Sequence, residues 1–320
     1  METRSVVSYK SPLGAPINIV KQTFSSARSK PVKSISFLAG LHGDELDGVY
    51  LCCLLLRYLR DLKATKPSAF LGEINIYPAV NPEAICNGSR LWPFFSVDMN
   101  RLMGAGKDNS LTVATSQELL ADVKANSDLV VDFHASNQHL IELPQIRVIK
   151  EFERKLLPLA MQCNMDVIWI HPLAEVLELT LGYNLNRAGI STLVVETGTC
   201  LRINQQFCHQ VFKGMLNLLQ YTGILDEPPS QPVSRPIIVN PSQVGMVMAN
   251  RSGLFLSRVW VGQQVFKGDK LGELIDPLRG EVLEEVVIPF YGQVFTLREL
   301  PLVYEGALLA RVALEGEEPR

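Results

Sequence analysis

A histidine and a carboxylate follow the first apolar segment of the 320-residue chain at short spacing. The segment 34–39 (SISFLA) leads into Gly40-Leu-His42-Gly-Asp-Glu45, where a strand would give way to a helix. At this junction His42 and Glu45 can both face one point. Zinc takes imidazole nitrogen and carboxylate oxygen, and catalytic zinc sites usually have three protein ligands and one open position. The pair therefore supplies two candidate metal ligands.

His134 is the candidate for the third ligand. It follows the apolar segment 129–133 (LVVDF), which predicts a buried strand. Ligands of open α/β sheets gather at the carboxyl ends of the strands, which is where His134 would lie. Asp132 could orient the imidazole of His134 through a hydrogen bond. The sequence thus predicts a metal site held by two histidines and one glutamate.

Glu196 ends another apolar segment, 191–196 (STLVVE). A carboxylate at the end of a buried strand is costly unless it has a partner or a function. Beside a water molecule activated by a metal, a glutamate is the expected general base. Glu196 is therefore the candidate catalytic base.

Polar residues of the loop region that follows Asn81-Pro82 are candidates for binding substrate. Arg90, Asn100 and Arg101 lie within twelve positions of one another. The planar guanidinium of arginine binds a carboxylate in bidentate fashion, and an arginine can also polarise a carbonyl. The alternative is a surface loop with ordinary salt bridges.

Strand-like and helix-like segments alternate over the first two thirds of the chain, which predicts an α/β fold with a mixed, largely parallel sheet flanked by helices. This arrangement would bring the carboxyl ends of the strands, and the candidate residues, to one edge. The predicted strands are 34–39, 73–80, 129–133, 166–170 and 191–196, and the predicted helices are 46–62, 115–124, 152–162 and 204–219.

A change of composition divides the chain. Residues 226–236 (DEPPSQPVSRP) contain four prolines and read as a linker. We therefore expect an α/β domain over 1–225 and a small all-β domain over 226–320. The latter carries a weak repeat in which Gly253 aligns with Gly292 and Leu271 with Leu309. Two such halves resemble a biotinyl/lipoyl-type barrel-sandwich, but there is no lysine after Lys270 to carry a prosthetic group.

Composition and charge exclude several classes of protein. The net charge is −3, from 30 basic and 33 acidic residues, which gives no indication of binding to nucleic acid or to an anionic membrane. No apolar run approaches the ~20 residues that span a bilayer. The six cysteines are scattered without a C-x-x-C pair, which favours free thiols and a cytoplasmic protein. Composition does not fix the oligomeric state, and a homo-oligomer remains open.

Together, these motifs resemble the succinylglutamate desuccinylase/aspartoacylase family of zinc deacylases, which is related to the M14 zinc carboxypeptidases. The resemblance covers about residues 34–220 in the order G-x-H-G-D-E, N-P, R, D-x-N-R, D-x-H and E-x-G. By position, it implies the following roles: zinc ligands for His42, Glu45 and His134, a general base for Glu196, carbonyl polarisation for Arg90, and carboxylate binding for Asn100 and Arg101.

The activity implied by the resemblance is hydrolysis of the amide bond of a small N-acyl amino acid, with one zinc ion per chain. The alternatives are a metallocarboxypeptidase of the M14 type that acts on a peptide C-terminus, and a metal-free binding protein on the same scaffold. A site narrowed by the C-terminal β domain would favour small acyl substrates. Arg187 and Tyr291 are further candidates for substrate contact, and the apolar loop 91–97 (LWPFFSV) departs from the family pattern and could reshape the pocket.

Overall fold

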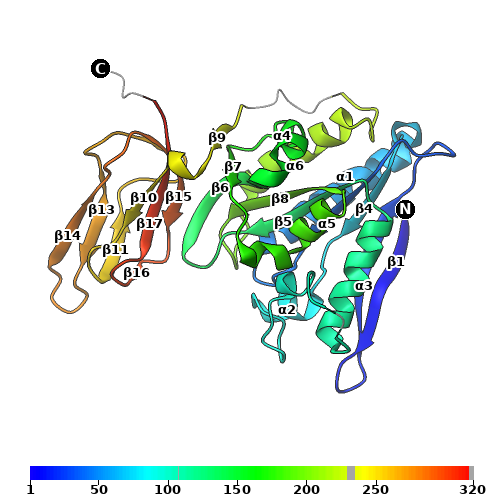
Figure 1. Ribbon diagram of the computed structural model, residues 1–320, viewed down its shortest axis with the longest axis horizontal. Coiled ribbons are helices and arrows are strands. Elements are labelled where there is room, and N and C mark those ends of the chain that lie inside the picture. Colours follow the sequence, from blue (N-terminus) through cyan, green and yellow to red (C-terminus); the bar gives the residue numbers. More distant parts are fainter. Residues whose placement is uncertain (107, 229–234, 317–320) are drawn as a thin grey trace.

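The protein consists of a wide mixed β-sheet flanked by helices and of a second, smaller sheet in the C-terminal part (Figure 1). The computed structural model describes residues 1–106, 108–228 and 235–316. Within these residues the α-helices are α1(Leu46–Thr65), α2(Pro82–Asn87), α3(Leu111–Ala125), α4(Glu153–Ala160), α5(Leu181–Arg187) and α6(Gln205–Tyr221). The short 3₁₀ helices are η1(Pro67–Ala69), η2(Met99–Arg101), η3(Lys150–Phe152), η4(Glu175–Leu179) and η5(Pro241–Gln243).

Parallel strands form the centre of the large sheet. In the α/β part its order is β1-β2-β4-β3-β5-β8-β6, with β7 paired to β6 and β9 paired to β7, and the sheet continues beyond β6 into the C-terminal part. The β3–β4, β3–β5 and β5–β8 pairs are parallel, whereas β6 runs antiparallel to β8. The strands of the α/β part are β1(Glu2–Lys10), β2(Pro16–Phe24), β3(Ser34–Ala39), β4(Glu73–Tyr77), β5(Leu129–Ala135), β6(Leu140–Ile149), β7(Val167–His171), β8(Ser191–Gly198) and β9(Ile237–Val239).

Apolar periodicity accounts for the layers on either side of this sheet. In α1, Leu51, Leu55 and Leu59 recur every four residues and are fully buried, the pattern of a helix with one apolar stripe. α1 packs with α6 over one face of β3, β5 and β8. The helices α3 and α5 pack with Leu38 and Val130 on the opposite face. No helix in the described part of the chain is long and apolar enough to cross a membrane.

The predicted mixed, largely parallel sheet flanked by helices is confirmed, with differences at the ends of elements. Strand β4 ends at Tyr77, directly before Pro78, because proline lacks the N–H that the sheet needs. The predicted helix 152–162 is shorter, as α4, and follows η3. Several elements of the α/β part were not predicted: the N-terminal hairpin β1–β2, strands β6 and β9, and helices α2 and α5.

The C-terminal part is antiparallel throughout, and its two halves exchange short strands. Its strands are β10(Val244–Met248), β11(Gly253–Ser257), β12(Gln264–Val265), β13(Lys270–Ile275), β14(Val282–Val287), β15(Gly292–Arg298), β16(Leu302–Val303) and β17(Leu308–Leu314). In this region β12 of the first half pairs with β15, and β16 of the second half pairs with β11. The reciprocal pairing explains the sequence repeat. The domain boundary at 225/226 stays a prediction, and linker residues 229–234 lie outside the described residues.

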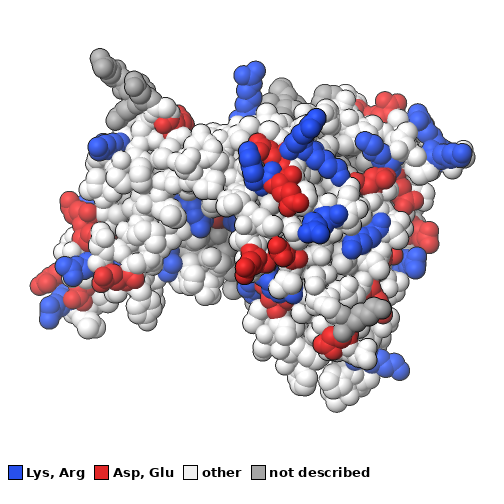
Figure 2. All heavy atoms as spheres, in the orientation of Figure 1, with Lys and Arg blue, Asp and Glu red and all other residues white. Residues whose placement is uncertain are grey.

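Strand β6 joins the two parts of the protein. It pairs antiparallel with β8 on one side and, through Leu140–Glu142, with β15 on the other. One hydrogen-bonded sheet therefore continues from the α/β part into the C-terminal region, as the ribbon shows (Figure 1). Acidic and basic side chains are intermixed on the visible surface of both parts, with wide uncharged areas between them (Figure 2).

Candidate active site

The carboxylate of Glu45 lies between two imidazole rings. Its Oε1 is 2.7 Å from Nδ1 of His42, and its Oε2 is 2.8 Å from Nδ1 of His134. The backbone N–H of Ala135 also donates to Oε2, at 3.2 Å. All three side chains are buried, and their ligand atoms lie within 4.8 Å of one another. This group of His42, Glu45 and His134 is hereafter called the His–Glu–His cluster.

The backbone around His42 explains why glycines surround it in the sequence. Gly40 ends β3 with a φ of +74°, a conformation that glycine adopts without strain. At Gly43, a Cβ atom would lie 1.9 Å from the carbonyl carbon of Ala84, so only glycine lets the turn pack against α2. The turn therefore places His42 at the end of β3 and Glu45 directly before α1.

Two further carboxylates hold the outer nitrogens of the rings. Asp98 Oδ1 is 3.0 Å from Nε2 of His42, and Asp132 Oδ2 is 3.0 Å from Nε2 of His134. Such contacts fix ring orientation and leave Nδ1 for a metal. Both Nδ1 atoms point at Glu45, so two nitrogens and one carboxylate converge, a donor set that suits zinc. The residues present therefore fit a catalytic zinc ion.

Charge compensation within the cluster shifts its pKa values. Burial works against the charged form of His42, but Glu45 and Asp98 outweigh this effect and raise its pKa. For His134, Asp132 and Glu45 likewise outweigh burial and raise the pKa well above its usual range. Burial also disfavours the Glu45 carboxylate, yet the two histidines lower its pKa. Glu45 is therefore charged at neutral pH and ready to bind a cation.

Glu196 lies beside the cluster because strand register places it there. It is the direct neighbour of His134 across the β5–β8 pair. Its Oε1 is 3.2 Å from Nη1 of Arg147, which extends from β6. Burial raises the pKa of Glu196 to about 7, because Arg147 and His134 only partly offset the loss of solvation. A carboxyl with a pKa near neutrality can both accept and release a proton.

The three loop residues reach the same site. Arg90 donates to Glu45 Oε1 at 3.1 Å and lies 3.3 Å from Asp98 Oδ2, so its guanidinium lies beside the cluster. Asn100 is buried, and its Oδ1 accepts the backbone N–H of Leu181 at 2.8 Å. This bond orients the amide so that Nδ2 is the donor offered to a ligand. Arg101 donates to the carbonyl of Asn100 at 3.1 Å.

All of these side chains line one cavity. Its volume is about 450 Å³, within the range of pockets that hold small molecules. It is bordered by every predicted site residue: His42, Glu45, Arg90, Asn100, Arg101, His134 and Glu196. The arrangement combines a potential metal centre, a carboxyl of raised pKa and cationic donors in one space. Chemically, it can polarise a carbonyl, activate water and bind an anion.

Comparison with known proteins assigns the chain to a family. The family model of the succinylglutamate desuccinylase/aspartoacylase catalytic domain matches residues 31–222, more than half of the chain. The chain belongs to the succinylglutamate desuccinylase/aspartoacylase family. The matched segment contains every predicted site residue. None of the curated proteins searched matches the chain.

Solved structures of other proteins share the fold over nearly the whole chain. A succinylglutamate desuccinylase/aspartoacylase from Rhodobacter sphaeroides is 22% identical, with a TM-score of 0.79 over 96% of this chain and 91% of that one. The product-bound ectoine utilization protein EutE (DoeB) from Ruegeria pomeroyi is 20% identical, with a TM-score of 0.78 over 97% and 93%. A succinylglutamate desuccinylase from Silicibacter sp. TM1040 is 18% identical, with a TM-score of 0.80 over 97% and 93%. The C-terminal β region is therefore part of the shared fold.

Two other residues considered as substrate contacts lie elsewhere in this family member. Arg187 is exposed on α5 and donates to the hydroxyl of Tyr183 at 3.1 Å. Tyr291 stacks on Phe266 in the β region, with ring centroids 5.3 Å apart. Neither lines the cavity. Spacing from Glu196 suggested Arg187, but spacing does not tell which way a helical side chain points.

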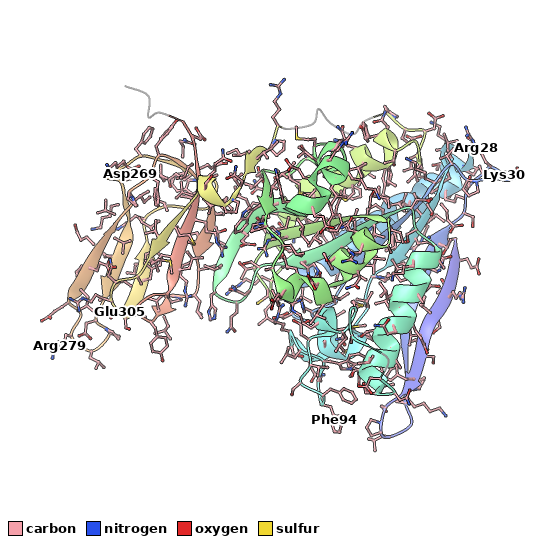
Figure 3. The ribbon with its side chains drawn as sticks, viewed as in Figure 1. Arg28, Lys30, Phe94, Asp269, Arg279 and Glu305 are labelled. Atoms are coloured by element: carbon pink, nitrogen blue, oxygen red, sulfur yellow. The ribbon has the colours of Figure 1, made fainter. Side chains whose placement is uncertain are left out.

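The apolar loop 91–97 also stays outside the cavity lining. Trp92 is buried, whereas Phe94 is 88% exposed at the lower end of the α/β part (Figure 3). Phe94 and Ser96 have positive φ angles of 67° and 54°, a backbone conformation uncommon outside glycine. Residues 91–97 therefore do not reshape the cavity by lining it, contrary to the expectation from the sequence.

A group of charged residues next to Glu196 was not predicted. Glu142 is buried and accepts from Arg147 at 2.9 Å and from Arg311 at 3.1 Å. Both guanidiniums lie over the ring of Trp169, at 5.7 and 5.2 Å from its centroid. Arg311 belongs to β17, so the C-terminal β region contributes to the cavity wall. The positions of Glu142, Pro144, Gln145 and Arg147 break the alternation that marks a strand, which concealed β6 and this group from sequence analysis.

We predict that the purified protein binds about one zinc ion per chain through the His–Glu–His cluster. Replacing His134 with alanine should weaken zinc binding by at least ~100-fold. Loss of a residue that only hydrogen-bonds to a metal ligand already lowers metal affinity by about 10–100-fold. Elemental analysis and competition with a chromophoric chelator measure this. The matched control is His171→Ala, because His171 lines the same cavity outside the cluster. Equal losses in both variants would contradict the assignment.

The raised pKa values of His42 and His134 predict that zinc affinity depends on pH. Zinc requires neutral imidazoles, so protons compete with the metal. Because both pKa values are raised, competition persists above pH 6.5, and affinity should fall as pH decreases through the neutral range. Below both pKa values, log Kd should change by up to about two per pH unit, one proton for each histidine. A zinc affinity that stays constant over this pH range would contradict binding by the two histidines of the His–Glu–His cluster.

Proposed function

We propose that the protein hydrolyses the amide bond of a small N-acyl amino acid, with one zinc ion held by His42, Glu45 and His134. The observation that carries the proposal is that this cluster and Glu196 line one cavity together with Arg90, Asn100 and Arg101. A zinc ion bound there would act as a Lewis acid toward the amide carbonyl and make water more acidic. The family membership of the chain supports a deacylase.

Glu196 carries the protons of the reaction. Its carboxylate takes a proton from the attacking water, and its raised pKa lets the resulting carboxylic acid return that proton to the leaving amine. The ion pair with Arg147 holds the Glu196 carboxyl at a fixed position on β8. The products are a carboxylic acid and an amino acid.

Arg90 stabilises negative charge on the carbonyl oxygen. Its guanidinium lies beside the cluster, 42% exposed, at the place where a substrate carbonyl would meet it. A preorganised cationic donor aimed at the developing oxyanion is among the strongest contributions to acyl transfer. Asp98 orients Arg90 and His42 together, since its two oxygens contact one each.

Arg101 and Asn100 bind the carboxylate of the amino acid. Arg101 supplies charge, and Asn100 supplies the Nδ2 donor fixed by its bond to Leu181. A substrate without a carboxylate would lose these contacts. A panel of N-acetyl and N-succinyl amino acids compared with dipeptides tests the substrate class. Faster cleavage of dipeptides would instead assign the protein to the carboxypeptidases.

Replacing Glu196 with glutamine should lower kcat by about 10²–10⁴-fold and leave zinc content unchanged, because the proton acceptor is lost while the metal ligands stay. In the wild-type protein, the rate should rise with pH through about 7, since the base must be deprotonated. Steady-state kinetics on N-acetyl amino acids measure both effects. The control is Glu118→Gln on the exposed side of α3. A near-normal rate in Glu196→Gln would exclude Glu196 as the base.

Replacing Arg101 with alanine should raise KM for carboxylate substrates by about 10–100-fold, the loss expected for one charged hydrogen bond. The effect on kcat should be smaller, because Arg101 binds a group that does not react. Initial rates over a range of substrate concentrations separate the two parameters. Arg154→Ala, on the exposed side of α4, is the matched loss of charge. An unchanged KM would remove Arg101 from the substrate site.

A further inference from the structure

The cavity extends away from the metal cluster along β8. Thr192, Val194 and Glu196 are alternate residues of this strand, and all three line the cavity. At ~3.3 Å per residue, the lining runs about 13 Å from Glu196 to Thr192. Val194 keeps part of its surface exposed although β5 and β6 flank its strand. The part of the cavity on the sheet face to which Val194 points is hereafter called the β8 arm.

Apolar and small residues enclose the β8 arm. Ile149 at the end of β6, Leu156 of α4 and Leu177 of η4 line it together with Val194. Gly182 of α5 covers the strand so closely that a Cβ atom there would lie 2.7 Å from Val194 Cγ2. A pocket with such walls gains free energy from burying apolar groups.

The polar side chains of the arm are bonded to the protein itself. Asn186 donates to the carbonyls of Gly182 and Thr192 and accepts the N–H of Thr192. Thr180 and Thr192 each donate their hydroxyl to a nearby backbone carbonyl. These hydrogen bonds occupy the polar atoms of Asn186, Thr180 and Thr192, so few donors or acceptors are left for a charged ligand. A charged group placed among them would lose its hydrogen bonds to water and gain few from the protein.

The cationic residues near the arm are neutralised. Arg147 pairs with Glu142 and Glu196, and Arg311 pairs with Glu142, so both guanidiniums already have carboxylate partners within the protein. His171, which lies beside Ile149 in the β6–β7 pair, has a pKa lowered by burial and is neutral at pH 7. Among the described residues that line the arm, the two guanidiniums of Arg147 and Arg311 are thus already paired, and the Arg101 guanidinium is assigned to the α-carboxylate.

The proposed carboxylate-binding residues, Asn100 and Arg101, lie next to the segment from η4 to α5 that borders the β8 arm. Asn100 accepts the N–H of Leu181, the first residue of α5, and the Gly104 N–H bonds to the carbonyl of Leu179 at the end of η4. In an amino acid, the α-carboxylate and the side chain branch from the same carbon. The acylated nitrogen branches from that carbon as well. With the carboxylate at Asn100 and Arg101 and the amide at the His–Glu–His cluster, the side chain is the remaining branch, and the β8 arm is the part of the cavity left for it.

We propose that the β8 arm selects N-acyl amino acids whose amino-acid side chain is apolar, such as leucine, methionine or phenylalanine. The inference rests on the proposed function and adds the substrate class. One methylene in an apolar pocket changes kcat/KM by about 10–200-fold. N-acetyl-L-leucine should therefore exceed N-acetyl-L-aspartate and N-acetyl-L-glutamate by at least ~10-fold in kcat/KM.

Filling the arm tests the inference. Leu177→Trp should lower kcat/KM for N-acetyl-L-leucine by at least ~10-fold and leave N-acetylglycine, which has no side chain, within ~2-fold. Val176→Trp is the matched control, because Val176 is the preceding residue of η4, is 53% exposed and does not line the cavity. Ile149→Phe fills the arm from β6 instead of η4. This second variant keeps the test decisive if Leu177→Trp fails to fold. Equal loss on both substrates in both filling variants would overturn the inference.

Binding separates the inference from the proposed function. Calorimetric titration of the zinc-loaded Glu196→Gln protein with N-acetyl-L-leucine and N-acetyl-L-aspartate reports selectivity without turnover. Tighter binding of the leucine compound, with no hydrolysis by the wild-type protein, would support the arm and overturn the hydrolase. Hydrolysis by the wild-type protein with a preference for the aspartate or glutamate compound would overturn the inference and leave the hydrolase intact.

Discussion

The buried carboxylate of Glu45 is the constraint on which the site depends. A carboxylate that has lost its water must find hydrogen-bond donors or positive charge within the protein. Glu45 meets this need with two imidazoles, a guanidinium and one backbone N–H. Those partners come from the turn after β3, the loop before η2 and the end of β5. A single negative charge at the start of α1 therefore holds these three segments together.

Strand register extends this arrangement across the sheet. His134 of β5 faces Glu196 of β8, which in turn faces Gln145 of β6. Asp132 and Val194, two residues earlier on β5 and β8, and Arg147, two residues later on the antiparallel β6, form the next row on the same face. Because side chains alternate along a strand, a slip of one residue would turn these groups into the apolar core beneath α1 and α6. The apolar core on one face of the sheet therefore sets the strand register that brings the site residues together on the other face.

Sequence patterns predicted the parts of this design that depend on uninterrupted apolar runs. Strands β3, β5 and β8 are such runs, and each has a site residue at or just beyond its carboxyl end, so the strands and the positions of His42, His134 and Glu196 could be predicted. Strand β6 has a proline and three polar residues that face the cavity or the neighbouring sheet, and no simple period marks it. Arg147 and Glu142 were missed with it. Arg311, more than a hundred residues after Glu196, reaches the cavity only through the pairing of β6 with β15.

That pairing means that the C-terminal β region is not a detachable cover. Backbone hydrogen bonds from Leu140–Glu142 continue the sheet into β15, and Glu142 lies buried between guanidiniums from both parts. A chain cut after residue 225 would present the edge of β6 to solvent and would also leave β7 without β9. Open strand edges of this kind pair with other chains. Such a fragment would self-associate when expressed alone, so the protein is best handled and engineered as one piece.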